Sequence, residues 1–306
     1  MHVTKTQKNI HYLLNETFKN FSEDNAPKLS ASLSYYTIFS LPPLLLVIIY
    51  LCGLLFGADA IRGTIFEQIK GFVGDSAAAQ IQAIIINIKL SHHNVFAAII
   101  GLGTLLIGAT SMFAEIQSSI NYIWGLRAKP QRGVMKFIKN RLMSFSMIGI
   151  MGATLTAGLV LNFIMNILEK QFVLILPLIA VHIVHALNIA VVFVNIAVLF
   201  TVIFRFLPDA RVAWKDAFVG ASCTALLFMI GKFGISMYLA HSNVASAYGV
   251  AGSLISLLLW IYYSSFILYF GAEFTRVFAC THGKKIVPLS YAVLIDKTVR
   301  EINSHS

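Results

Sequence analysis

Hydrophobic residues gather into six long runs along the chain, and shorter polar segments separate the runs. Each run reaches or exceeds the ~20 residues that an α-helix needs to cross the hydrocarbon core of a bilayer. The six runs cover residues 29–56, 95–124, 142–168, 172–204, 217–239 and 250–270. The pattern therefore predicts an all-α, polytopic membrane protein with six transmembrane helices.

Basic residues are concentrated in alternate polar segments. The segments 1–28, 125–141, 205–216 and 271–306 hold 4, 6, 3 and 5 Lys or Arg, whereas the other three segments hold 3, 1 and 0. Short loops rich in Lys and Arg stay on the cytoplasmic side of a membrane, and an even number of spans puts both termini on one side. We therefore expect both termini to be cytoplasmic.

Two of the polar segments have a helical periodicity of their own. In the cytoplasmic segment 1–28, the apolar stripe consists of Ile10, Leu13, Leu14, Thr17, Phe18 and Phe21. We expect an amphipathic helix that lies in the membrane interface with its apolar face among the acyl chains, or packs on the inner mouth of the bundle. The outer loop 57–94 predicts two short amphipathic helices, which cap the bundle or lie on the lipid surface. The membrane domain then covers residues 29–280, and a cytoplasmic tail covers residues 281–306.

The composition excludes a soluble globular protein. Hydrophobic residues make up 58% of the chain and charged residues only 12%, whereas about 25% charge is usual in soluble domains. The net charge of +10 comes mostly from loops that flank the spans, so membrane orientation explains it better than nucleic-acid binding. Cys52, Cys223 and Cys280 form no CxxC pair and indicate neither a disulfide framework nor a thiolate metal site. We expect no cofactor and no nucleic-acid partner.

Polar side chains inside predicted spans are costly in lipid, so they usually face the bundle interior. With a rise of about 1.5 Å per residue, several of them fall in one layer on the outer side of the bilayer centre. The predicted polar cavity is lined by Lys232, His182, His185, Asn188 and Asn162. Such a cavity would open outward and suit an anionic head group. The alternative is a structural network of buried hydrogen bonds.

Charged residues also gather toward the predicted cytoplasmic face. Glu115 and Glu273 lie near the cytoplasmic ends of the second and sixth spans, in the half where Arg205 ends the fourth. We expect structural ion pairs at this inner mouth, with a proton relay as the alternative. The loop after the second span contains no acid, so its cations either contact anionic lipid head groups or serve only to orient the chain. These cations are Arg127, Lys129, Arg132, Lys136, Lys139 and Arg141.

Five short segments carry a family pattern. They are LSYYTIFSLPPL at 33–44, EIQSSINYIW at 115–124, YGVAGSL at 248–254, WIYYS at 260–264 and FGAEFT at 270–275. Over residues 10–280 the chain resembles the YihY/BrkB family of bacterial inner-membrane proteins. The resemblance implies a multi-pass, six-helix protein of the bacterial cytoplasmic (inner) membrane with cytoplasmic termini and a poorly defined molecular function. Tyr248 and Val250 depart from the family pattern, where Gly or Ala is more usual, and this affects packing more than class.

Members of that family are often named ribonuclease BN, but this chain lacks the residues that nuclease chemistry needs. Two-metal hydrolysis requires clustered carboxylates or His. The 13 acids are mostly dispersed through loops, with no HxHxDH or HExxH motif. The side chains of adjacent His92 and His93 diverge on either a helix or a strand. We therefore predict that the protein is not a nuclease, and we identify no other enzyme chemistry.

Two functional classes are left. A transporter-like protein that binds or moves an anionic amphiphile, such as a lipid or an envelope precursor, fits the polar layer, the basic inner loop and the bend predicted at Pro42 and Pro43. A non-transporting scaffold or envelope assembly factor needs only helix-packing stripes such as Gly149, Ala153 and Ala157. We favour the first class and expect membrane lipids as partners. A homo-oligomer is compatible with the sequence, which identifies no protein partner.

Overall fold

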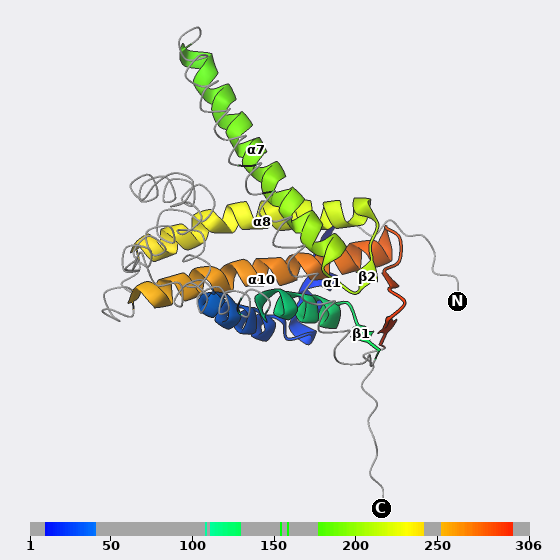
Figure 1. The fold of residues 1–306 in the computed structure, drawn as a ribbon. Helices are drawn as coiled ribbons and strands as arrows, with labels where there is room; N and C mark the ends of the chain where they lie inside the picture. The colour runs from blue at the N-terminus through cyan, green and yellow to red at the C-terminus, as the bar shows by residue number, and fades with distance from the viewer. Residues whose placement is uncertain are drawn as a thin grey trace, which may run out of the picture.

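The computed structural model describes residues 10–40, 108, 111–129, 154, 158, 177–241 and 252–295, and this part of the chain is mostly helical (Figure 1). The N-terminal half contributes α1 (Ile10–Glu23), a helix over 26–40 and a helix over 111–123. The C-terminal half contributes three long helices, α7 (Pro177–Phe206), α8 (Trp214–His241) and α10 (Gly252–Thr281). Four short strands complete the elements: β1 (Leu126–Ala128), β2 (Ala210–Arg211), β3 (Val287–Pro288) and β4 (Ala292–Leu294).

Three of the described helices are long and apolar enough to cross a membrane, by length and composition. They are Ala186–Phe206, Trp214–Tyr238 and Leu254–Thr281. These segments coincide with the last three predicted spans, and the described parts of the first two spans are also helical, so the helical prediction is confirmed there. The outer loop, the proline pair and most of the third span lie outside the described residues. The count of six spans and the side of the termini stay predictions.

Helices α8 and α10 pack side by side through a reciprocal pair of small residues. A Cβ on Gly220 of α8 would overlap the Thr275 hydroxyl of α10, and a Cβ on Gly271 of α10 would overlap the Thr224 hydroxyl of α8. Each threonine donates its hydroxyl hydrogen back to its own helix, Thr224 to Gly220 O at 2.8 Å and Thr275 to Gly271 O at 2.7 Å. The glycines therefore allow close approach while the buried hydroxyl groups stay satisfied, as small-residue interfaces between membrane helices require.

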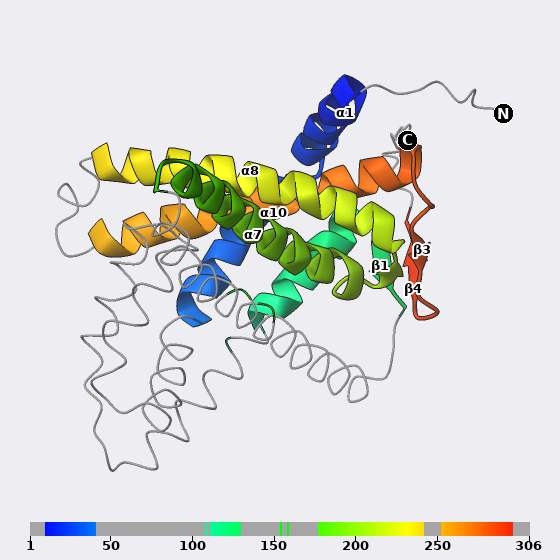
Figure 2. The same cartoon turned by 90° about the horizontal axis from the view of Figure 1, so that it is seen from above.

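Helix α8 lies between α7 and α10, and aromatic side chains join the three helices. The ring of Phe228 on α8 lies 6.1 Å from that of Phe200 on α7 and 6.2 Å from that of Trp260 on α10. Figures 1 and 2 show α8 running alongside α10 and α7 crossing α8 at an angle. The described core is richest toward one end of these helices, where Tyr269 and Phe204 are fully buried.

The amphipathic N-terminal helix predicted from the apolar stripe is present as α1, and it packs on α10. Leu13, Thr17 and Phe21 are buried, and the Phe21 ring lies 4.6 Å from that of Phe266 on α10. The structure thus shows α1 packed on the bundle, while Ile10, Leu14 and Phe18 of the same stripe are exposed, so its placement in the membrane interface stays a prediction. Asn25, with a φ of 51°, adopts the left-handed conformation between α1 and the helix over 26–40. Asparagine tolerates this conformation better than most residues, so it marks the break between the two helices.

The described residues are mostly helical, as predicted, but they also include short paired strands that the all-α prediction did not contain. β1 pairs antiparallel with β4, with Arg127 opposite Val293, and β2 pairs antiparallel with β3, with Arg211 opposite Val287. The strands are only two or three residues long, too short for the alternating pattern by which a strand is recognised in sequence. They bring residues 124–129, 207–213 and 282–295 together at one end of the helices, which we call the loop end (Figure 1).

Candidate functional site at the loop end

A buried carboxylate, Asp209, joins three segments of the loop end. Its Oδ1 accepts hydrogen bonds from Gln117 Nε2 at 3.0 Å and Tyr291 Oη at 3.2 Å, and its Oδ2 accepts one from Asn121 Nδ2 at 2.9 Å. Its backbone N–H donates to Asn121 Oδ1 at 2.9 Å, and its carbonyl accepts from Leu289 N at 3.0 Å. Gln117 and Asn121 are four residues apart and share one helix face, which lets both reach the same carboxylate.

The carboxylate also alters the acidity of its tyrosine partner. The pKa of Tyr291 is raised to about 12, mainly by burial and in smaller part by the negative charge and the hydrogen bond of Asp209. Ionising the phenol would place a second negative charge beside Asp209 and remove the donor that the carboxylate uses. Tyr291 therefore acts as a neutral hydrogen-bond donor at any physiological pH.

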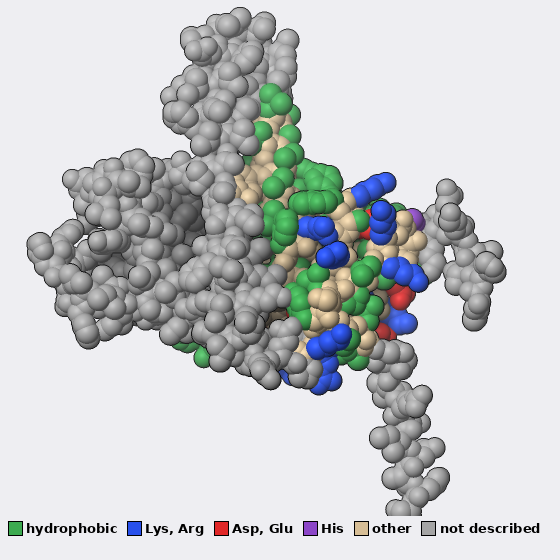
Figure 3. Space-filling model, turned by 45° about the vertical axis from the view of Figure 1, so that its right-hand side comes forward, with side chains coloured by type: hydrophobic (Ala, Val, Ile, Leu, Met, Phe, Trp, Pro, Cys, Tyr) green, Lys and Arg blue, Asp and Glu red, His purple; other side chains and the backbone are tan. Residues whose placement is uncertain are grey.

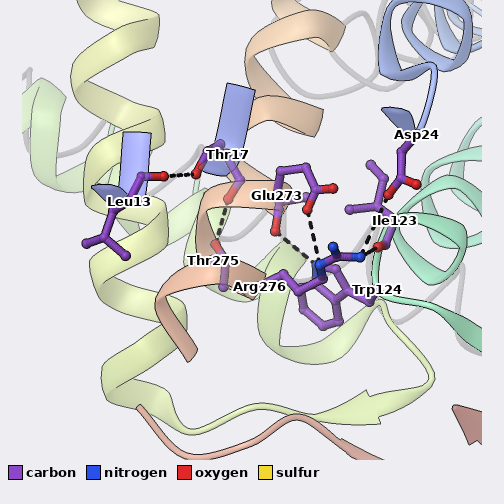
Figure 4. A network of polar contacts seen from close by, with 10 residues as sticks. Leu13, Thr17, Asp24, Ile123, Trp124, Glu273, Thr275 and Arg276 are labelled. Carbon is purple, nitrogen blue, oxygen red and sulfur yellow. Dashed lines mark hydrogen bonds and ion pairs between the residues drawn. The ribbon is translucent and has the colours of Figure 1, made fainter. Parts of the chain in front are cut away.

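A second polar network links α1, the helix over 111–123 and α10 (Figure 4). Arg276 Nε lies 3.3 Å from Oε2 of the fully buried Glu273, and Arg276 Nη1 lies 3.7 Å from Asp24 Oδ2 and donates to the carbonyl of Ile123. Trp124 Nε1 donates to Ala272 O at 2.9 Å in the same region. One guanidinium thus compensates two buried carboxylates, since buried charges must be paired and hydrogen-bonded.

A third buried carboxylate, Asp216, fixes the turn after α10 against the start of α8. Asp216 Oδ2 accepts a hydrogen bond from Lys284 N at 2.8 Å. A Cβ on Gly283 would overlap the Asp216 carboxylate, so only glycine leaves room for this approach. Asp216 also lies in the first turn of α8, where a negative charge interacts favourably with the helix dipole.

These contacts separate the charges of the loop end, with carboxylates inside and cations outside. Asp24, Asp209, Asp216 and Glu273 are buried. The cations on the surface of this end are exposed; they are Arg127, Lys129, Arg211, Lys215, Lys284 and Lys285. Figure 3 shows Lys and Arg side chains spread over this part of the surface. The arrangement can attract anionic groups, because most of the compensating negative charge is held beneath the surface.

Aromatic residues mark the point where two membrane-crossing segments meet this cationic surface. Trp214, at the start of α8, is 56% exposed, and Phe206, at the end of α7, is 44% exposed. Their rings lie 5.6 Å apart in an edge-on arrangement, and Arg205 Cζ lies 5.5 Å from the centre of the Trp214 ring. Exposed Trp beside Arg and Lys at the ends of apolar helices is typical of the boundary between hydrocarbon and head groups.

The residues of the predicted polar cavity are only partly described. Lys232 is half-buried on α8, and Asn188 is exposed on α7. His182 and His185 lie on the backbone of α7, but their side chains are outside the described part, as is Asn162. The cavity stays a prediction. A further polar residue of α7, Asn195, is buried and donates to Thr154 O at 3.4 Å.

The residues predicted at the inner mouth make specific contacts, and one of them is in an ion pair. Glu273 pairs with Arg276, Arg205 donates to the carbonyl of Val212, and Glu115 accepts a hydrogen bond from Ser119 Oγ at 3.5 Å.

In the basic loop, Arg127 and Lys129 belong to the loop end, and Lys129 Nζ donates to Ser290 O at 3.2 Å. Arg132, Lys136, Lys139 and Arg141 lie outside the described residues.

Sequence reasoning missed the acids that organise the loop end, Asp24, Asp209 and Asp216, and the cation Arg276. One feature of the sequence could have pointed to two of these residues, because Asp209 and Asp216 are the only acids of the basic segment 205–216. An acid kept within a cationic loop is a good candidate for a buried structural anchor. Within the described residues, no group of three or more His, Cys, Asp or Glu is arranged to hold a metal ion.

Comparison with known proteins relates the chain to a family of membrane proteins. The family model described as "Virulence factor BrkB" matches residues 17–290. A "UPF0761 membrane protein" of Saccharophagus degradans is 26% identical over 262 residues, which cover 86% of this chain and 58% of that protein. Proteins of the same name from Tolumonas auensis and Psychromonas ingrahamii are 26% and 25% identical and are covered over 80% and 88% of their lengths.

The chain spans little more than half the length of several of these relatives, including 55% of one from Ralstonia nicotianae. No solved structure matches the chain. The family match extends from α1 through the helices of membrane-crossing length to β3, and so includes Asp209, Asp216, Glu273 and Arg276, whereas Tyr291 and β4 follow its end. This protein is therefore a membrane protein of the BrkB family.

Proposed function

We propose that this BrkB-family protein is a transporter-like protein of the bacterial cytoplasmic membrane that binds or moves an anionic amphiphile, such as a lipid or an envelope precursor. In this proposal the chain crosses the membrane six times and both termini are cytoplasmic. The observation that carries the proposal is Lys232, a half-buried cation inside the segment Trp214–Tyr238. A cation is costly within a span, and such residues commonly mark the path of a substrate or an ion.

The charge separation at the loop end supports the same ligand class. Exposed cations attract anionic head groups to that end, while Lys232 offers a positive charge deeper along α8. Asn188, exposed on the neighbouring helix α7, adds a polar group within the segment Ala186–Phe206. An anionic amphiphile could use both features, because its head group seeks cations and its acyl chains stay in the hydrocarbon.

The test is movement of a labelled lipid across vesicles that contain the purified protein. Vesicles would carry a fluorescent phosphatidylglycerol or phosphatidylcholine, and a membrane-impermeant reductant would report the label that reaches the outer leaflet. We expect faster movement of the anionic lipid than in protein-free vesicles. Lys232→Met should slow it about tenfold or more, because a hydrogen bond to a charged group contributes about 1.5–3 kcal/mol.

Two variants control for charge and for position. Lys232→Arg keeps the positive charge and should retain most of the rate, whereas Lys19→Met removes an exposed cation of α1 that has Glu23 as a local partner and should leave the rate within about twofold. Equal rates with and without wild-type protein, or an unchanged rate in Lys232→Met, would contradict the proposal.

The second candidate function is a non-transporting scaffold or envelope assembly factor. The observation in its favour is the anchoring of the loop end by Asp209 and by Arg276, which gives this face a fixed shape. Absence of lipid movement, together with a stable complex recovered from membranes after cross-linking and lost in Asp209→Asn, would favour the scaffold.

A further inference from the structure

Four exposed cations of the loop end come from two chain segments that the structure holds together. Arg211 is in β2 and pairs in register with Val287 of β3, two residues after Lys285. Lys215 follows on α8 and directly precedes Asp216, whose carboxylate accepts the backbone N–H of Lys284 at 2.8 Å. We name these four residues the β2–α8 cation cluster: Arg211, Lys215, Lys284 and Lys285.

Two described carboxylates beside this cluster, Asp216 and Asp209, are buried and accept hydrogen bonds. Asp216 is only 3% exposed, and its Oδ2 is used by the Lys284 backbone. Asp209, 7% exposed, uses both carboxylate oxygens for side-chain donors. The four cations therefore outnumber the two carboxylates below them, and their side chains reach the surface with positive charge in excess.

The cluster lies at the ends of two membrane-crossing segments, at the depth expected for lipid phosphates. Ala186–Phe206 ends five residues before Arg211, and Trp214–Tyr238 begins one residue before Lys215. Phe218, one helical turn after Trp214, is 50% exposed and continues the aromatic surface into the apolar part of α8. A ligand bound here would thus meet cations at one end and an aromatic, apolar helix surface at the other.

We propose that the β2–α8 cation cluster and Trp214 form a binding site for an anionic phospholipid, with the phosphate-bearing head group on the cations and an acyl chain along Trp214 and Phe218. Charge complementarity favours an anionic over a zwitterionic head group. The apolar surface favours a lipid over a free anion. The site rests on the proposed function for its ligand class and deepens it by naming the residues that bind the lipid, and it does not require that the protein move the lipid.

Fluorescence quenching by brominated lipids tests the site, because Trp214 is exposed whereas Trp124 is buried. The full chain would be reconstituted in vesicles with increasing fractions of brominated phosphatidylglycerol or brominated phosphatidylcholine. The difference between wild type and Trp214→Phe isolates the signal of Trp214. We expect half-maximal quenching of this signal at a fraction of the anionic lipid at least about tenfold lower than that of the zwitterionic lipid, since each interfacial cation contributes about fivefold and two already exceed tenfold.

Replacing one pair of lysines then tests the contribution of the cluster's positive charge. Lys284→Ser/Lys285→Ser should lower the preference at least about fivefold. Lys284→Arg/Lys285→Arg should retain it. The serine variant keeps the backbone N–H that binds Asp216, and both lysine side chains are exposed, so the fold is expected to persist. Lys19→Ser is the matched control, because Lys19 is exposed but has Glu23 at 4.0 Å as a local partner; its loss should leave the preference unchanged.

Equal quenching of wild type by the two lipids, or an unchanged preference in the serine variant, would overturn the site. Abolition of the preference by millimolar inorganic phosphate would also overturn it, because the site would then take a free anion. The outcome is separable from that of the proposed function. Wild-type protein that moves lipid but shows no preference would refute this site alone, and wild-type protein that shows the preference but moves no lipid would refute lipid movement alone.

Discussion

Replacing Asp209 with Asn tests whether one buried carboxylate fastens the loop end. Its side chain accepts hydrogen bonds from Gln117, Asn121 and Tyr291. The amide keeps the shape, but it loses the charge and turns one acceptor into a donor that faces another donor. Hydrogen bonds to a charged group contribute about 1.5–3 kcal/mol each, and an unsatisfied buried donor costs about 1–3 kcal/mol. Because these effects overlap, we expect Asp209→Asn to lower the free energy of unfolding by about 3 kcal/mol.

A double-mutant cycle with Tyr291→Phe isolates one of these bonds. Unfolding would be followed in mixed micelles with increasing dodecyl sulfate, through the fluorescence of Trp124, which is buried at this end. The coupling energy between Asp209 and Tyr291 should be at least about 1 kcal/mol. Ser290→Ala changes an exposed neighbour and serves as the control, which should be additive with Asp209→Asn. Additivity of the Asp209 and Tyr291 substitutions would refute the proposed anchoring bond.

The same pair predicts a pH dependence. The pKa of Tyr291 is raised from its ordinary value of 10 to about 12, so between these values the folded protein keeps a proton that the unfolded chain has lost. Stability should therefore fall as the pH rises from 10 to 12, and this contribution to the slope should be absent in Tyr291→Phe. In Asp209→Asn the pH range over which stability falls should become narrower but persist, because burial is the largest cause of the raised Tyr291 pKa and the carboxylate only adds to it.

Three other perturbations test the packing, the ion network and the orientation. Gly271→Ala places a methyl group against Thr224 and should lower the free energy of unfolding by about 1–3 kcal/mol. Gly234→Ala is the control, because its site is open, and it should be neutral or stabilising by up to about 1 kcal/mol. Equal effects of the two substitutions in the same detergent titration would contradict the close packing of α8 and α10. Arg276→Met leaves the buried carboxylates of Asp24 and Glu273 without their guanidinium. It should lower the free energy of unfolding by about 3–5 kcal/mol and speed protease cleavage near α1. Unchanged cleavage would argue against the ion network. In a variant whose other cysteines are replaced by Ser, the exposed Cys280 should react with an impermeant maleimide in inverted vesicles and not in intact spheroplasts, and the opposite result would place the loop end outside the cell.

The long helices could be predicted from sequence because the bilayer dictates their length and composition. The ends of the helices were predicted less accurately than their positions. The apolar run of the last span stops at Phe270, yet α10 continues to Thr281. Glu273 and Arg276 end the apolar pattern, but they do not end the helix, because each is compensated by the other one turn away. In the same way α8 begins at Trp214, three residues before its apolar run, and includes Asp216, which its first turn accommodates.

The candidate site could not be predicted in the same way, because it depends on contacts between residues far apart in the chain. Asp209 bonds to residues 88 and 92 positions before it and 82 positions after it. Neither periodicity nor composition carries such pairings, and strands of two or three residues leave no pattern of their own. The cations of the loop end could be predicted from the bias of Lys and Arg toward alternate loops. The burial of the acids beneath them could not, because it shows only in the folded structure.

The directions of the described helices provide a geometric argument for the membrane topology. The helix over 26–40 begins near the loop end, where Asp24 meets Arg276, and Ser40 at its other end contacts Met112, the second residue of the helix over 111–123. That helix runs back to the loop end, where Ile123 also meets Arg276. Helix α7 runs toward the same end, α8 away from it and α10 toward it again, because β2 and β3 join there. Two successive described helices, 111–123 and α7, thus run toward the loop end, and the sequence independently predicts a third span between them. The basic bias therefore predicts one cytoplasmic side for the same segments that the helix directions bring to the loop end, and the two arguments are independent, one electrostatic and one geometric.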